Sequence, residues 1–191
     1  MLRYRSVGIK KHILSWWPGL HNSIPLTILL LLVAACSGGG GSSPAPNPTP
    51  PSVSAPLPPD PGSAGLATIA GRDSNNNGVR DDLERYIALT YPNPVEAGTR
   101  AAMTQYVKAE QTMLLDAADP QKSMANAINL GHAIECLLAI RPADFNQAFT
   151  QLDGQVLNTD NRVDAYLTAD EKLGGLTYEV TPPEQGLTLC H

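Results

Sequence analysis

Residues 120–140 read PQKSMANAINLGHAIECLLAI, and this stretch predicts a helix that packs into the core. Its apolar residues recur at spacings of three and four, which places them on one stripe of an α-helix. Proline is favoured in the first helical turn, so Pro120 suits the start, and Arg141-Pro142 marks the end. The stripe consists of Met124, Ala127, Ile128, Ala133, Ile134, Leu137 and Leu138.

The same spacing predicts helices on both sides of this one. We expect them at about 79–90, 95–117 and 143–157, with a shorter helix at 162–173 before Gly174-Gly175. The predicted fold of residues 66–191 is therefore all-α, a small bundle of four to five helices with short connections. The expected apolar faces are Leu83, Tyr86, Ile87 and Thr90, then Met103, Tyr106, Val107, Glu110, Met113 and Leu114, then Phe145, Phe149, Leu152 and Val156.

The C-terminal tail after Gly175 does not continue this pattern. Residues 176–180 alternate as a strand does, but no other segment offers an obvious partner, so we predict an irregular tail. Cys136 and Cys190 are the two cysteines of the domain, and in an oxidising compartment an even number of thiols indicates a disulfide. The alternative is a buried free Cys136 and an exposed Cys190.

The N-terminal segment, residues 1–35, has the features of an export signal. Its charged residues are all basic and precede an apolar stretch, 24–35, that is too short to span a bilayer. The stretch ends in Leu32-Val33-Ala34-Ala35-Cys36, which resembles the lipobox of bacterial prolipoproteins. The resemblance implies cleavage before Cys36, a lipid on that cysteine and, because Ser37 follows, sorting to the outer membrane. The alternative is a plain secretory signal with an incidental cysteine.

Residues 36–65 comprise the expected lipidated cysteine and a segment of Gly, Ser, Pro and Ala with almost nothing to bury. Such a composition predicts an extended tether between membrane and domain. Loss of residues 1–35 takes the formal net charge from −5 to −9, since that segment contributes four positive charges. An acidic exported domain repels nucleic acid, so we expect no nucleic-acid partner and regard cations as natural ligands.

Residues 73–84, DSNNNGVRDDLE, crowd carboxylates and carboxamides around one glycine. The order resembles the EF-hand calcium loop, in which oxygen ligands stand at places one, three, five, seven, nine and twelve, with glycine at place six. The resemblance implies a Ca²⁺ site, and Gly78 fills the glycine place. The ligands would be Asp73, Asn75, Asn77, the main-chain carbonyl of Val79, Asp81 and Glu84.

Three features set this loop apart from paired EF-hands. Arg80 occupies a place that is usually apolar, the chain has no second loop of this pattern, and the preceding GLATIAG is too short for an incoming helix. We therefore predict a single structural calcium loop followed by a helix. The alternative is a metal-free, Asx-rich turn that caps the helix.

Enzyme chemistry has thin support in the sequence. His132 and Glu135 share a helix face, but no further ligand or nucleophile motif accompanies them. We expect a non-catalytic binding or scaffolding module of the bacterial envelope, anchored through Cys36 and contacting an envelope protein or the cell wall. The alternative is an envelope enzyme whose site lies between helices, with calcium purely structural. A polar cleft containing His132 and Glu135 would favour the enzyme, and an exposed apolar helix face would favour the binding module.

Overall fold

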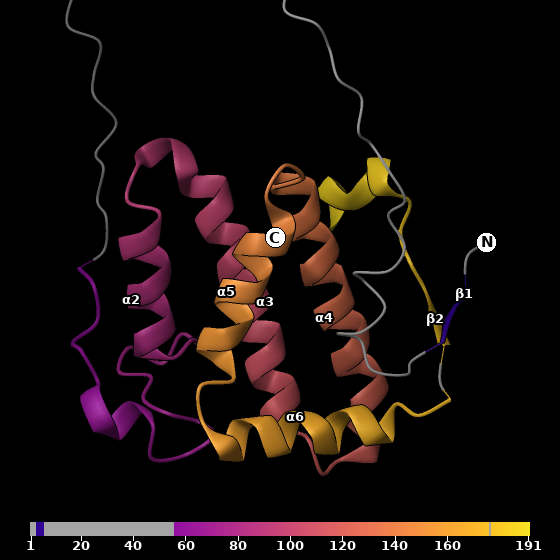
Figure 1. The fold of residues 1–191 in the computed structure, drawn as a ribbon, viewed down its shortest axis with the longest axis horizontal. Coiled ribbons are helices and arrows are strands. Elements are labelled where there is room, and N and C mark those ends of the chain that lie inside the picture. Colours follow the sequence, from indigo (N-terminus) through magenta and orange to yellow (C-terminus); the bar gives the residue numbers. More distant parts are fainter. Residues whose placement is uncertain (1–2, 6–55, 176) are drawn as a thin grey trace, which may run out of the picture.

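The computed structural model describes residues 3–5, 56–175 and 177–191 (Figure 1). Within that range the domain is a bundle of α-helices, which confirms the predicted all-α class. Cys36, most of the predicted signal and the linker up to residue 55 lie outside the described residues. The helices are α2 (Asp81–Thr90), α3 (Ala97–Leu115), α4 (Pro120–Ile140), α5 (Phe145–Val156) and α6 (Asp160–Lys172), and short 3-10 turns are η1 (Gly62–Gly65), η2 (Pro94–Glu96) and η3 (Pro183–Leu189).

The helix ends follow local chemistry. Pro120 is the first residue of α4, and the Asp119 side chain accepts a hydrogen bond from the Gln121 amide at 2.9 Å. Helices α2, α3 and α5 each start two residues later than the apolar pattern suggested. Arg80 is extended, so α2 begins at Asp81, and the turn η2 with its Asn93–Glu96 capping box precedes α3.

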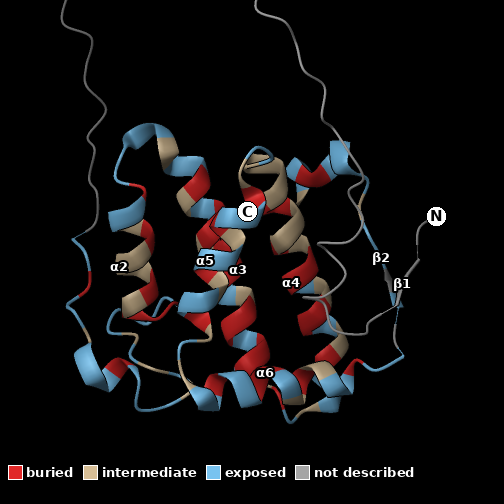
Figure 2. Cartoon of the chain, viewed as in Figure 1, coloured by how far each residue is buried: buried red, intermediate tan, exposed pale blue. Residues whose placement is uncertain are grey.

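Helix α3 is the centre of the bundle. In Figure 1, α2, α3, α4 and α5 run roughly alongside one another, and α6 crosses one end of them. Figure 2 shows that the buried faces of these helices turn inward toward α3. The α3 side chains of Met103, Tyr106, Val107, Met113 and Leu114 are 2% exposed or less. Most of the predicted apolar side chains thus form one core. Thr90 is exposed, Met124 and Ile128 are only partly buried, and Ala127 packs with Leu173 in a separate small cluster.

One predicted core position carries a charge. Glu110 of α3 is 1% exposed and lies beside Tyr106, whose hydroxyl donates to Asp153 of α5 at 2.9 Å. Burial, followed by the negative charges of Glu110 and Asp153, raises the pKa of Tyr106 well above its ordinary value. The phenol therefore stays protonated, and it links α3 to α5 through a polar contact inside the core.

The tail is fastened along α4. Cys136 and Cys190 form the predicted disulfide, which closes a loop between residues 54 apart in sequence and typically adds about 2–4 kcal/mol of stability. The Thr181 amide donates to Glu135 at 3.1 Å, and at Gly186 an added Cβ would lie 3.0 Å from that of Ala139. The tail thus packs closely on α4 although few of its side chains are apolar.

The prediction that residues 176–180 lack a pairing partner was wrong. Strand β2 (Thr177–Glu179) pairs antiparallel with β1 (Arg3–Arg5), so that Arg3 faces Glu179 and Arg5 faces Thr177. The partner strand belongs to the predicted signal segment, which sequence reasoning had set aside before any strand was matched. If that segment is removed, the mature domain keeps β2 without this partner.

Helix α4 has the length and composition of a membrane-spanning helix. By length and composition it is the one helix in the described part of the chain that could cross a bilayer. Half of its apolar window is buried inside the bundle, however, and its Cys136 side chain is fully buried in the disulfide. A helix that packs in the core of a bundle meets the same criteria of length and composition.

Asp170 of α6 gives a pH-dependent prediction. Its Oδ1 atom is buried and has no hydrogen-bond partner among the described residues, and burial raises its pKa. Because the pKa of Asp170 is raised in the folded state, the ionised carboxylate destabilises the fold at pH values above that pKa. Below the unfolded-state pKa of about 3.9 the group is protonated in both states, and this destabilisation disappears. Asp170→Asn should therefore raise the melting temperature at pH 7 and leave it nearly unchanged at pH 3.

Thermal melts of the full-length protein at both pH values measure this effect. Asp164→Asn, an exposed substitution on the same helix, is the matched control and should change neither melt. A lower melting temperature for Asp170→Asn at pH 7 would contradict the prediction.

Candidate functional site

The loop at residues 73–84 is wrapped around Asp73. The Asp73 carboxylate accepts hydrogen bonds from the main-chain amides of Asn77 at 3.2 Å and Gly78 at 2.9 Å. Asn76 and Gly78 have φ values of +57° and +85°, the left-handed region in which asparagine and glycine are tolerated. Places one, five and six of the predicted loop therefore fold into one tight turn.

Places three, five and twelve meet at Glu84. The side-chain Nδ2 of Asn75 donates to Glu84 Oε2 at 3.2 Å, and the side-chain Nδ2 of Asn77 donates to Glu84 Oε1 at 2.5 Å. Glu84 stands in the first turn of α2, so the helix itself delivers this carboxylate to the loop. The structure thus brings together Asp73, Asn75, Asn77 and Glu84.

Asp81 is the buried member of the predicted set. Its side chain is completely buried, and Oδ1 accepts from the amide of Ser74 at 2.9 Å and from its hydroxyl at 3.0 Å. In the described part of the chain Oδ2 has no hydrogen-bond partner. A buried carboxylate oxygen without a donor is costly unless a cation or proton compensates it.

Val79 completes the predicted set. Its side chain is 2% exposed and belongs to the core, while its amide donates to Asn77 Oδ1 at 2.8 Å. Across the described residues no group of three or more His, Cys, Asp or Glu side chains is placed to hold a metal ion, so Asp73, Asp81 and Glu84 do not form such a group. The remaining predicted ligands are carboxamide oxygens and a main-chain carbonyl, which suit a hard cation such as Ca²⁺.

Arg80, the residue that departs from the calcium-loop pattern, turns inward. It is 1% exposed, and its guanidinium pairs with Asp82 at 2.7 Å. It also donates to the carbonyls of Val156 at 2.9 Å and Gln155 at 3.0 Å, at the end of α5. These carbonyls belong to the last helical turn, where helices leave acceptors unpaired and favour a positive charge. Arg80 therefore fixes the loop to the C-terminal end of α5.

Arg162 is the second buried arginine, and its exposed fraction is zero. It donates to the carbonyls of Gly65 at 2.6 Å, Thr68 at 2.9 Å and Ile69 at 3.2 Å, and to the Asn158 side chain. These three carbonyls lie in the segment that leads from the tether to the loop. We refer to Arg80 and Arg162 as the arginine pair.

The arginine pair carries charges that must be balanced inside the protein. Burial first, and then the like charge of Arg80, lowers the pKa of Arg162 to about 10, so it remains protonated at neutral pH. Burial alone would raise the pKa of Asp82, but the hydrogen bond and charge of Arg80 outweigh it and hold that pKa below its ordinary value. Asp82 is thus ionised and partly neutralises the pair.

Gly71 lets the backbone approach the arginine pair. Its φ is +64°, and an added Cβ would lie 2.9 Å from both Arg162 Nη2 and Arg80 Cδ. Any other residue would push the two side chains apart.

Sequence reasoning missed Arg162, although a signal was present. On α6 the buried residues are Arg162, Ala165, Tyr166 and Ala169, which share one face of the helix because 165 and 166 lie three and four residues after 162, and 169 lies four and three after them. A charged residue on an otherwise apolar stripe predicts a buried, multiply bonded charge.

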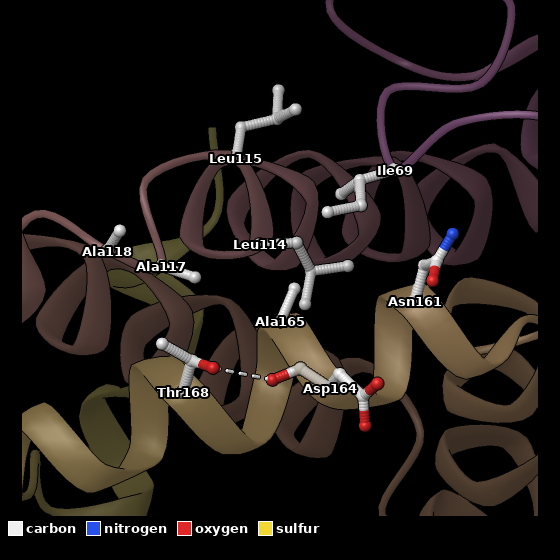
Figure 3. A pocket seen from close by; sticks show the side chains of 9 residues that line it. All are labelled: Ile69, Leu114, Leu115, Ala117, Ala118, Asn161, Asp164, Ala165 and Thr168. Atoms are coloured by element: carbon white, nitrogen blue, oxygen red, sulfur yellow. Dashed lines mark hydrogen bonds between the residues drawn. The ribbon is translucent and has the colours of Figure 1, made fainter.

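The His132–Glu135 pair does not form a shared site. Glu135 is occupied by the tail amide of Thr181, whereas His132 lines a groove between α3 and α4. A separate hollow of about 370 Å³ lies between the end of α3 and α6 (Figure 3). Leu114 and Ala165 face each other across it, and the Thr168 hydroxyl is bonded to the Asp164 carbonyl at 2.8 Å. That hollow is mainly apolar and gathers no set of convergent polar groups.

Comparison with protein-family models, with curated proteins and with solved structures found no match to this chain.

Arg162→Lys should lower the free energy of unfolding by about 2–4 kcal/mol, because an ammonium group on a shorter side chain leaves several buried carbonyls without donors. Urea denaturation of the full-length protein measures this change. Arg72→Lys, the same substitution at an exposed position of the preceding segment, should stay within about 0.5 kcal/mol. Equal stability of the two variants would show that the buried guanidinium does not support the fold.

Proposed function

We propose that this protein is a lipid-anchored module of the bacterial envelope, stiffened by one calcium ion at the junction between tether and bundle. The observation that carries the calcium proposal is the buried Oδ2 of Asp81, which lacks a donor inside the Asp73–Glu84 loop. A divalent cation would compensate this charge and that of neighbouring carboxylates.

The kinds of donor in the loop are those that calcium prefers, and calcium binding would have to draw the three carboxylates together from their positions in the structure. Asp73, Asp81 and Glu84 would supply carboxylate oxygens, Asn75 and Asn77 would supply carboxamide oxygens, and Val79 would supply its carbonyl. Three carboxylates with two amides indicate an affinity typical of extracellular modules, with Kd about 10⁻⁴ to 10⁻³ M. Such a site would be filled by the calcium level outside the cell and would act structurally.

The position of the loop supports a role in anchoring. The loop follows the segment that Arg162 holds, and α2 begins at Asp81 within the loop. A cation here would stabilise the first part of the folded domain, on which any force along the tether acts. The lipid anchor itself is proposed from Leu32–Cys36 and from the Pro- and Gly-rich segment behind it.

A binding role is favoured over catalysis by one surface feature. Val163 and Leu167 stand four residues apart on α6, hence on one face, and are 38% and 55% exposed. Exposed apolar side chains on one helix face suit contact with an envelope protein or with a cell-wall component.

Calcium titration of the full-length protein tests the loop. We expect binding heat that saturates at one calcium ion per chain. At a free calcium concentration of 100 times Kd, the free energy of unfolding should exceed that in chelator by about 2.7 kcal/mol. Glu84→Gln and Asp81→Asn should abolish both effects because each removes a ligand charge. Glu171→Gln, an exposed change on α6, should leave both intact. No heat and identical melts would reduce the loop to a helix-capping turn.

Expression in a bacterial host tests the anchor. The chain should partition with membranes and incorporate a labelled fatty acid, and Cys36→Ser should lose both properties because it removes the acceptor thiol. Cys190→Ser, which breaks the disulfide instead, should keep the label. A labelled Cys36→Ser variant would exclude this cysteine as the lipid site.

A further inference from the structure

A groove of about 640 Å³ runs between α3 and α4 and reaches the last residue of the chain. Its volume falls within the range of small-molecule sites. Helix α3 contributes the small side chains of Ala101 and Ala109, which leave space between two otherwise closely packed helices. The groove lies apart from the apolar hollow of Figure 3, with which it shares no lining residue.

Several polar groups of the groove are not used by the fold. Thr104 and Lys108 of α3, with Asn129 and His132 of α4, line it, and none of their side chains makes a hydrogen bond or ion pair with any residue that the structure describes. They offer a hydroxyl, an ammonium, a carboxamide and an imidazole to a ligand. Asn126, by contrast, is already bonded to Asp116 at 3.1 Å, and Asp116 is neutralised by Lys122 at 2.7 Å.

Among the described residues that line the groove, Lys108 is the one side chain with a formal charge at pH 7. The lining includes Lys108 and the imidazoles of His132 and His191, and no aspartate or glutamate side chain appears among the described residues that form it. The formal net charge of the whole chain is −5. An ammonium group in a groove whose described lining has no carboxylate side chain favours an anionic ligand.

The tail is held so that His191 stays at this groove. The Gln105 carboxamide donates to the Leu189 carbonyl at 2.8 Å and accepts from the His191 amide at 3.1 Å. The neighbouring Cys190 is bonded to Cys136 of α4. One side chain of α3 and one disulfide on α4 thus fix the last residue from both helices that bound the groove.

We propose that the groove between α3 and α4 binds the carboxylate end of a short peptide with small side chains. Lys108 and His132 would receive the carboxylate, Asn129 and Thr104 would hydrogen-bond the peptide main chain, and Ala101 and Ala109 would leave room for small side chains. A sugar ring is a poorer fit because no aromatic side chain lines the described groove.

This site would give the proposed envelope module its ligand, and none of its lining residues is a proposed calcium ligand or the proposed lipidated cysteine. Calcium titration of the same preparation therefore separates the two proposals, since either one can fail while the other holds.

The test is calorimetric titration of the full-length protein with acetyl-Ala-Ala-Ala and with the same peptide as its C-terminal amide. The free carboxylate should bind about tenfold more tightly than the amide, the difference expected for one charge-assisted contact. Lys108→Met should weaken binding of the free carboxylate about tenfold and leave the amide unchanged. Lys172→Met removes an equal charge from an exposed position of α6 and should change neither affinity.

Three results would overturn the proposal. The first is absence of binding by both peptides while the protein remains folded by thermal melt. The second is equal affinity for acid and amide, which would mean that Lys108 does not receive the peptide carboxylate. The third is an unchanged affinity in Lys108→Met, which would place the peptide elsewhere on the domain.

Discussion

The guanidinium group of Arg162 is buried without solvent contact, and it accounts for the course of the backbone before α2. A buried charge is tolerated when it is extensively hydrogen-bonded, and Arg162 makes four hydrogen bonds, to Gly65, Thr68, Ile69 and Asn158. The segment it holds has few apolar side chains to bury. Residues 65–69 are therefore fixed mainly by polar contacts, and this order is transmitted to the loop that follows.

Arg80 extends the same constraint to α5. Because it bonds Asp82 and the carbonyls of Gln155 and Val156, the start of α2 and the end of α5 share one buried charge. Two neighbouring positive charges would repel each other, and Asp82 offsets them only in part. The loop carboxylates face the opposite need, since Asp81 buries an oxygen with no donor. Polar contacts on either side of the backbone thus fix the loop together with the buried side chain of Val79.

The helices were predictable because burial imposes its period on the sequence. The 120–140 stretch became α4 with both ends correct, and its stripe supplied Ala133 and Leu137 to the core. The disulfide followed from thiol parity, and the loop residues that gather around Glu84 followed from their spacing. The partners of Arg162 and Gln105 were not predictable, because each bonds main-chain carbonyls, which every residue carries and no sequence pattern marks. The β1–β2 pairing was missed because its partner lies in a segment assigned to export.

The two ends of the described domain are held by the same kind of contact on opposite sides of α3. A polar side chain bonds main-chain atoms of a weakly apolar segment, Arg162 near the tether and Gln105 at the tail. A feature that the fold itself does not use lies near each of these contacts. Near the tether it is the Asp81 oxygen without a hydrogen-bond donor, and near the tail it is the groove in which the side chains of Lys108 and His132 bond no other described residue. Lys108 also approaches the loop, where an added Cβ on Gly78 would lie 2.9 Å from its Cε. A cation in the loop would repel this ammonium, so Lys108 gives the loop and the groove a direct electrostatic link.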